Sequence, residues 1–87
     1  MNGRPIVVVA ADRVAEVVES LPVGAVVVVC DPDGGRAADV AARVTKQRTA
    51  VFAGDLADPG DREAIAAFCI DMLGGSPDQV LGPDPVV

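Results

Sequence analysis

Three aspartates each follow directly after a short apolar run, and they are the residues whose type and spacing could support chemistry in this chain. The pairs are Ile6–Ala11 with Asp12, Ala25–Cys30 with Asp31, and Val51–Gly54 with Asp55. Carboxylates gathered at one edge of a sheet could hold Mg²⁺ and, through the cation, a phosphate-bearing ligand. The structural alternative is that these residues cap helices and form turns, for which aspartate is favoured.

Several familiar catalytic chemistries are excluded by the residues that the chain lacks. It contains no histidine and no tyrosine, so the commonest general base and metal ligand are missing. It has no glycine-rich loop that ends in lysine, and Cys30 and Cys69 do not have metal-binding spacing. We therefore name no catalytic residue and no metal ligand, and we favour a protein that is not an enzyme.

The two cysteines are expected to pack as small, reduced, buried thiols. Cys30 ends an apolar run, and Cys69 falls on the apolar face of a predicted helix. Reduced thiols are typical of the cytosol, and we find no signal peptide or membrane-spanning run, so we expect a cytoplasmic location. The alternative for Cys30 is a lowered pKa, because the N-terminus of a helix follows it closely.

Three strands and three helices are predicted to position the aspartates. The strands are Ile6–Ala11, Ala25–Cys30 and Thr49–Gly54, because apolar runs without polar alternation are typical of strands buried on both faces. The helices are Asp12–Leu21, Arg36–Gln47 and a third that starts at Asp58 and ends at Gly74 and Gly75. The carboxyl ends of parallel strands meet at one edge, which is where open α/β sheets bind their ligands.

Capping residues and apolar spacing support these helices. Asp12 and Asp58 are predicted as N-caps of the first and third helices, and Pro59 as the first residue of the third. Apolar residues recur at helical spacing along the third helix, which predicts that one of its faces packs on the sheet. That face consists of Ile65, Phe68, Cys69 and Met72.

The element order β-α-β-α-β-α predicts an α/β fold, a minimal three-layer sandwich with a three-stranded parallel sheet. Residues 1–75 form this single domain, and residues 76–87 are predicted to be a flexible, proline-rich tail. The strand orders 3-2-1 and 2-1-3 both satisfy the crossover rule. Open sheet edges favour pairing with another chain, so we expect a homo-oligomer.

The charge distribution limits the partners of the protein. A formal net charge of −6 disfavours nucleic acids and anionic membranes. Four basic residues nevertheless lie close together in the sequence, namely Arg36, Arg43, Lys46 and Arg48. We interpret them as a solvated helix face, with a patch for an acidic partner as the alternative.

Residues 26–68 resemble the second half of the nucleotide-binding fold of short-chain dehydrogenases. The matching motifs are an apolar strand that ends in Asp31, the helix segment Ala37–Ala42 and the segment Gly54–Asp58. The resemblance implies a Rossmann-like fold. It also implies that Asp31 binds the adenosine ribose hydroxyls of NAD, and that Asp55 and Leu56 lie near the adenine.

The chain departs from that family at two of its motifs. Val9–Val14 contains no glycine, whereas the family has a glycine-rich turn there that brings the pyrophosphate to the helix N-terminus. The catalytic Tyr-x-x-x-Lys motif is absent, because the chain has no tyrosine. Tight binding of a dinucleotide is therefore not expected.

A second resemblance is to the receiver domain of response regulators. Val26–Asp31, followed by Pro32–Gly34, is similar to the phosphoacceptor strand and loop of that family, and Asp31 would be the phosphoacceptor. The family holds Mg²⁺ with a pair of acids after the first strand, but here Asp12 stands alone. The fifth strand of a receiver and its lysine are also missing.

These observations favour a non-catalytic protein-interaction or regulatory module that self-associates, needs no cofactor and docks a protein partner. The alternative is a small nucleotide- or Mg²⁺-dependent ligand-binding domain. It would use Asp31, Asp55 and Leu56 at the carboxyl edge of the sheet, with NAD or Mg²⁺ as the ligand.

Overall fold

The computed structural model describes residues 5–82 of the chain, which form a mixed α/β fold. The elements are β1 (Ile6–Ala10), the short helix η1 (Ala11–Arg13), α1 (Val14–Val18), β2 (Val26–Asp31), α2 (Gly34–Ala42), β3 (Arg48–Ala53), α3 (Pro59–Phe68), the wide helical turn η2 (Cys69–Leu73) and β4 (Gln79–Leu81). The valine-rich runs form the two central strands, β1 and β2, as their composition predicts.

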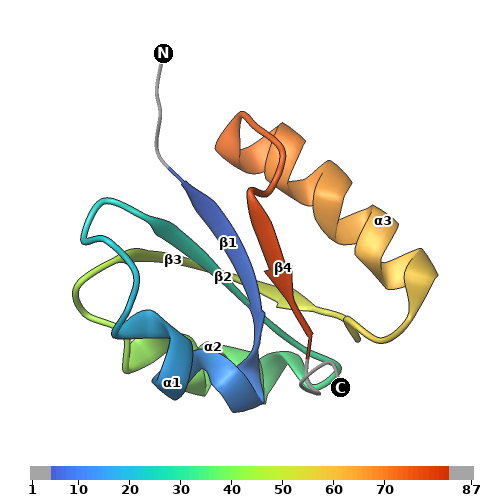
Figure 1. Ribbon diagram of the computed structural model, residues 1–87. Coiled ribbons are helices and arrows are strands. Elements are labelled where there is room, and N and C mark those ends of the chain that lie inside the picture. The colour runs from blue at the N-terminus through green and yellow to red at the C-terminus, as the bar shows by residue number, and fades with distance from the viewer. Residues whose placement is uncertain (1–4, 83–87) are drawn as a thin grey trace.

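The sheet is parallel and has four strands in the order β3-β2-β1-β4 (Figure 1). The prediction of a three-stranded sheet is therefore wrong in its strand count. Of the two strand orders left open above, 3-2-1 is the one found. The central pair is in register along its whole length, with Ile6 beside Val26 and Ala10 beside Cys30.

The fourth strand comes from the segment that was expected to be a tail. Val7 lies beside Gln79 and Val9 beside Leu81, so β4 covers the edge of β1. The start of β4 is anchored by Asp78, whose carboxylate accepts a hydrogen bond from Ile6 N at 2.8 Å. Asp78 N donates back to Ile6 O at 2.7 Å. Residues 83–87 of the expected tail lie outside the described residues.

Helices cover both faces of the sheet, as predicted from the apolar character of both faces of its central strands (Figure 1). Successive strand residues point to opposite faces, so Val27 and Val29 pack under α1 and α2 while Val28 and Cys30 pack under α3. Two phenylalanines connect the edge strand β3 to α3, the helix that covers this face of the sheet. The rings of Phe52 and Phe68 stand edge to face, with their centroids 5.4 Å apart.

Two of the predicted helices are shorter in the structure, and one predicted cap is wrong. α1 ends at Val18 rather than Leu21, and α2 spans Gly34–Ala42 rather than Arg36–Gln47. Asp12 caps no helix, because the chain after β1 first makes the turn η1, in which no side chain caps the N-terminus. The Asp12 carboxylate is paired with Arg36 instead.

The third helix begins as predicted and ends differently. Asp58 accepts a hydrogen bond from Gly60 N at 2.9 Å, and Pro59 occupies the first turn. The helix widens over η2 and then stops at Gly74, whose φ of 82° is left-handed. A wider turn advances the buried position by one residue, so Leu73 packs on the core and Met72 is 67% exposed. The prediction that Met72 is buried is wrong.

Candidate functional site

The structure brings two of the three strand-ending aspartates together through one arginine. Arg36, in the first turn of α2, is ion-paired with Asp12 after β1 and lies 3.6 Å from Asp31 Oδ2 at the end of β2. We call these three residues the carboxyl-edge cluster. Among residues 5–82, no hydrogen bond or ion pair joins Asp55 to this cluster.

The carboxylate of Asp31 is used within its own loop. Its Oδ1 accepts a hydrogen bond from Asp33 N at 2.9 Å, which closes the turn after β2. Asp33 in turn caps α2, accepting from Gly35 N at 2.9 Å and from Arg36 N at 3.3 Å. Asp31 therefore starts the turn and helps to position Arg36. A ribose ligand would have to compete with both contacts.

Asp55 and Leu56, the other two residues predicted to bind a cofactor, also have structural contacts. Asp55 Oδ1 accepts from Ala57 N at 2.9 Å, and Asp55 N donates to Asp61 Oδ2 at 2.8 Å. Leu56 is only 2% exposed and packs in the core cluster beneath α3. Its backbone oxygen accepts a hydrogen bond from Arg62 Nε at 2.5 Å. These contacts close the loop between β3 and α3.

The turn after β1 does not offer the open approach that a pyrophosphate needs. It contains no glycine, and Arg13 extends across it to Gly82 O at 3.4 Å and to Glu16 at 3.0 Å. Within residues 5–82, no group of three or more side chains has the composition and placement to hold a metal ion. The geometry therefore favours turn and capping roles for the acidic edge.

The cysteine thiols lie in the core, as predicted, and the alternative of a lowered pKa at Cys30 is wrong. Cys30 and Cys69 are free and buried. Burial, with a smaller contribution from the nearby Cys69, raises the pKa of Cys30 from 9.0 to about 12. Burial also raises the pKa of Cys69. The neutral thiol is a poor nucleophile, so neither cysteine is set up for catalysis.

The two edges of the sheet differ in how they are protected (Figure 1). β3 is six residues long, and the segment Thr49–Gly54 at this edge has no charge and no proline. β4 is only three residues long and follows directly after Pro77 and Asp78. The expectation of open edges anticipated this feature, but it could not distinguish one edge from the other.

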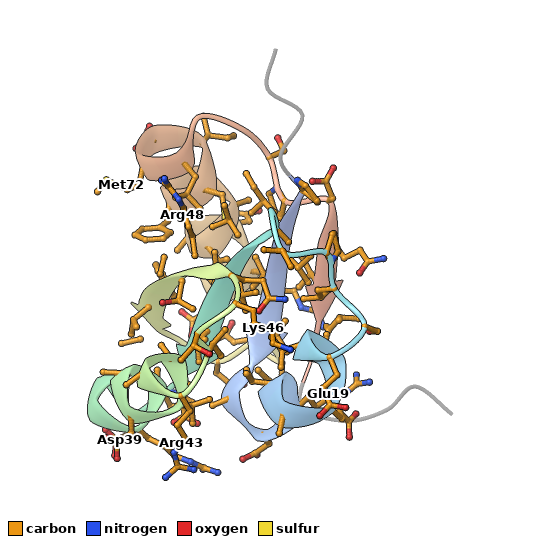
Figure 2. The ribbon with its side chains drawn as sticks, turned by 90° about the vertical axis from the view of Figure 1, so that its left-hand side faces the viewer. Glu19, Asp39, Arg43, Lys46, Arg48 and Met72 are labelled. Atoms are coloured by element: carbon orange, nitrogen blue, oxygen red, sulfur yellow. The ribbon has the colours of Figure 1, made fainter. Side chains whose placement is uncertain are left out.

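A groove between the ends of α1 and α2 was not anticipated. It has a volume of about 520 Å³. Six of the residues that line it are Val18, Leu21, Arg43, Val44, Lys46 and Gln47. Three residues labelled in Figure 2 belong to the lining of this groove, namely Arg43 after the end of α2, Lys46 in the segment that follows and Glu19 after α1. The cluster of basic residues was the only sequence signal for this groove.

The described part of the chain contains no helix that is long and apolar enough to cross a membrane. Comparison with protein-family models, with curated proteins and with solved structures finds no match to this chain.

Proposed function

We propose that this protein is a non-catalytic interaction module that self-associates by pairing the β3 edges of two copies. The observation that carries the proposal is the difference between the two sheet edges. Side chains along β3 are exposed at Arg48, Thr49, Val51 and Ala53, so the strand is open to another chain.

Natural sheets protect their edges with charges, prolines or very short strands. β4 has such protection, because it spans three residues directly after Pro77 and Asp78. β3 has only one charge, on Arg48 at its start. A six-residue edge with β-branched and aromatic side chains pairs readily with another strand. We therefore expect β3 to be the edge that pairs with another chain in solution.

Charge complementarity favours a second copy as the partner. A two-fold axis perpendicular to the sheet pairs two β3 strands antiparallel, and the same surface serves both subunits. In that arrangement the start of each β3 lies beside the end of the other. Arg48 of each copy then approaches Asp55 of the other, while the uncharged segment between them forms the centre of the contact. This pairing would join the two sheets into one.

The contacts at the carboxyl edge support the non-catalytic part of the proposal. Asp31 and Asp55 would be the residues of a nucleotide or Mg²⁺ site, but their carboxylates already accept hydrogen bonds from nearby backbone N–H groups. Leu56 packs in the core. No specific observation favours the ligand-binding alternative.

Sedimentation velocity over a range of protein concentrations tests the proposal. Val51→Lys places a charge at the centre of the proposed contact, on a side chain that is 37% exposed in the free chain. We expect it to weaken dimerisation at least about tenfold, because it brings like charges together across the two-fold axis. The matched control is Val80→Lys on β4, where the valine is 45% exposed.

The control is expected to leave dimerisation within about twofold of the unmodified protein, since β4 lies at the opposite edge. A strict monomer at millimolar concentration would contradict the proposal. A dimer that Val80→Lys disrupts and Val51→Lys does not would assign the contact to β4 instead.

A further inference from the structure

We propose that two copies of this chain pair with Val51 of one β3 opposite Val51 of the other, and that Arg48 of each copy binds Asp61 of the other. This inference rests on the proposed function, since it needs the two β3 edges to pair. It adds the register of that pairing and the two side chains that select a second copy of this chain as the partner.

The backbone of β3 determines which of its residues can pair at the free edge. Gly54 N donates to Asp31 O at 3.0 Å, so the backbone groups of Gly54 are turned toward β2. β3 stays in continuous register with β2 along its whole length. The N–H and C=O groups of successive strand residues point alternately to the two sides of a strand. The groups of Thr49, Val51 and Ala53 therefore point to the free edge.

The extent of the edge then selects the register. The hydrogen bond of Gly54 continues the ladder with β2 one residue beyond β3, so the edge runs from Arg48 to Gly54. Its midpoint is Val51, whose backbone groups point outward. In an antiparallel pair, such residues lie opposite each other and exchange both hydrogen bonds. Placing Val51 opposite Val51 therefore pairs the whole edge, whereas a shift by one residue opposes mismatched groups and a shift by two leaves part of each edge unpaired.

This register also determines which side chains meet on the face of the sheet that α3 covers. Ala50 and Phe52 pack against the core on that face, so Arg48 and Gly54 lie on the same face. All four residues fall in non-hydrogen-bonded pairs, where side chains approach most closely. Ala50 lies opposite Phe52, and the small alanine leaves room for the aromatic ring. Arg48 lies opposite Gly54.

Gly54 is covered by two side chains of its own subunit. A Cβ atom built on this glycine would lie 2.7 Å from the ring of Phe52 and 3.6 Å from Cβ of Asp61. Gly54 is buried, whereas Phe52 and Asp61 are partly exposed. A side chain opposite Gly54 therefore meets an aromatic ring and a carboxylate. Arginine suits both, because it has an apolar stem and a positively charged end.

The distance between Arg48 and Asp61 of the other subunit allows an ion pair. Opposite residues have Cβ atoms about 4.5–5.5 Å apart, so the Cβ atoms of Arg48 and Asp61 lie within about 9 Å of each other. An extended arginine and an aspartate together span this distance. Asp61 Oδ2 accepts from Asp55 N at 2.8 Å, which holds the carboxylate in place. Among residues 5–82, neither Arg48 nor Asp61 takes part in an ion pair within one copy.

The charges at the two ends of β3 favour a second copy of this chain. The segment that follows β3 contains Asp55, Asp58 and Asp61 but only one cation, Arg62. Arg62 Nε donates to Leu56 O within that segment. The end of β3 is therefore negative, whereas Arg48 makes its start positive. The two-fold axis brings these opposite charges together at two symmetric positions.

Sedimentation velocity of single and double variants tests the ion pair. Asp61→Asn removes the charge but keeps an oxygen that can accept from Asp55 N, so the loop after β3 stays closed. We expect Asp61→Asn and Arg48→Gln each to weaken dimerisation about fivefold, because each removes the ion pair at both symmetric positions. The double variant should bind no more than about twofold more weakly than either single variant, since the same interaction is already lost.

Two control variants remove the same charges away from the proposed pair. Glu63→Gln on α3 and Lys46→Gln before β3 each neutralise one exposed side chain, and each should change the dimerisation constant less than about twofold. Because the net charge of −6 makes two copies repel each other, removing an acid favours dimerisation unless that acid binds the other copy. Asp61→Asn that behaves like Glu63→Gln would therefore overturn the ion pair.

Nuclear Overhauser contacts between subunits test the register. In a sample that mixes isotopically labelled and unlabelled copies, we expect a contact between Hα of Ala50 and Hα of Phe52 in the other copy, because Cα atoms are closest in non-hydrogen-bonded pairs. Contacts of Ala50 with Ala50 or with Gly54 would shift the strands by two residues and overturn this inference, while the dimer of the proposed function would remain. A strict monomer would instead overturn the proposed function itself, and the ion pair with it.

Discussion

Replacing Leu56 by alanine tests whether this residue contributes to stability or to a ligand site. The resemblance to short-chain dehydrogenases implies that Leu56 lies near a nucleotide base, but in the structure it is among the largest fully buried side chains. It packs with Ile65 and Cys69, and the partly buried Phe52 and Phe68 extend the same cluster. The shortened side chain leaves a void in this cluster, and such a void adds to the loss of apolar burial.

The expected loss of unfolding free energy is large for a domain of this size. Burial to 2% exposure places Leu56→Ala in the range of about 2–5 kcal/mol for buried leucines, and we expect about 3 kcal/mol. At about 0.05–0.15 kcal/mol per residue, the whole domain has roughly 4–13 kcal/mol of unfolding free energy. The melting temperature should therefore fall by about 12–24 °C.

The matched control is Met72→Ala. The apolar spacing of α3 predicts that Met72 is buried, whereas the structure leaves it 67% exposed. Its truncation should cost no more than about 0.5 kcal/mol, as expected for a surface substitution. Urea denaturation of both variants, followed by circular dichroism, gives the two values. A cost for Met72→Ala equal to or greater than that for Leu56→Ala would refute the widened turn over η2.

The remaining predictions concern the thiols and the fourth strand. Because the pKa of Cys30 is raised from 9.0 to about 12 in the folded state, the unfolded state loses this proton first. The contribution of this thiol to the free energy of unfolding is therefore intact below pH 9 and falls by about 1.4 kcal/mol per pH unit between pH 9 and 12. Cys30→Ala should remove this contribution to the slope in pH-dependent denaturation. An unchanged slope would contradict the burial argument. Asp78→Ala removes the side-chain acceptor of Ile6 N and should speed amide hydrogen exchange in β4 about five- to tenfold. Asp71→Ala is the control. Equal exchange rates in the two variants would show that Asp78 does not anchor the strand.

The sequence predicts well the elements whose stability comes from their own residues. The prediction for β2 lies within one residue of its observed bounds, because a short run of β-branched valines between turn residues favours a buried strand. Asp58 and Pro59 start α3 as predicted, since capping depends on backbone groups only a few residues away. In both examples the residues that determine the structure are close together in the sequence.

The features that were missed depend on residues far apart in the sequence. β4 has only two apolar residues, and it forms a strand because the edge of β1 offers it hydrogen bonds. Asp12 is predicted as a cap because it directly precedes a helical segment. Its observed partner, Arg36, lies 24 positions further along the chain, and the local sequence does not reveal it. Gln47 was predicted at the end of a helix, and its contacts with the end of α1 exist only in the folded protein.

The candidate ligand residues show the same distinction. The sequence located Asp31 and Asp55 correctly at the carboxyl ends of their strands, since strand ends follow from the apolar runs. It could not show which donors their carboxylates meet. Those donors belong to turns, and the turn after β2 also depends on the position of Arg36.

The position of β4 beside β1 has a consequence for how the protein folds during synthesis. The hydrogen bond between Ile6 and Asp78 joins residues 72 positions apart, whereas β1 and β2 pair across only about 20 positions. The longer closure costs about 1 kcal/mol more in chain entropy. While the chain emerges from the ribosome, β1 and β2 can pair early, but the backbone N–H and C=O groups along the free edge of β1 stay unpaired until β4 has been made. During that interval a second edge, besides β3, is open to pairing with another chain.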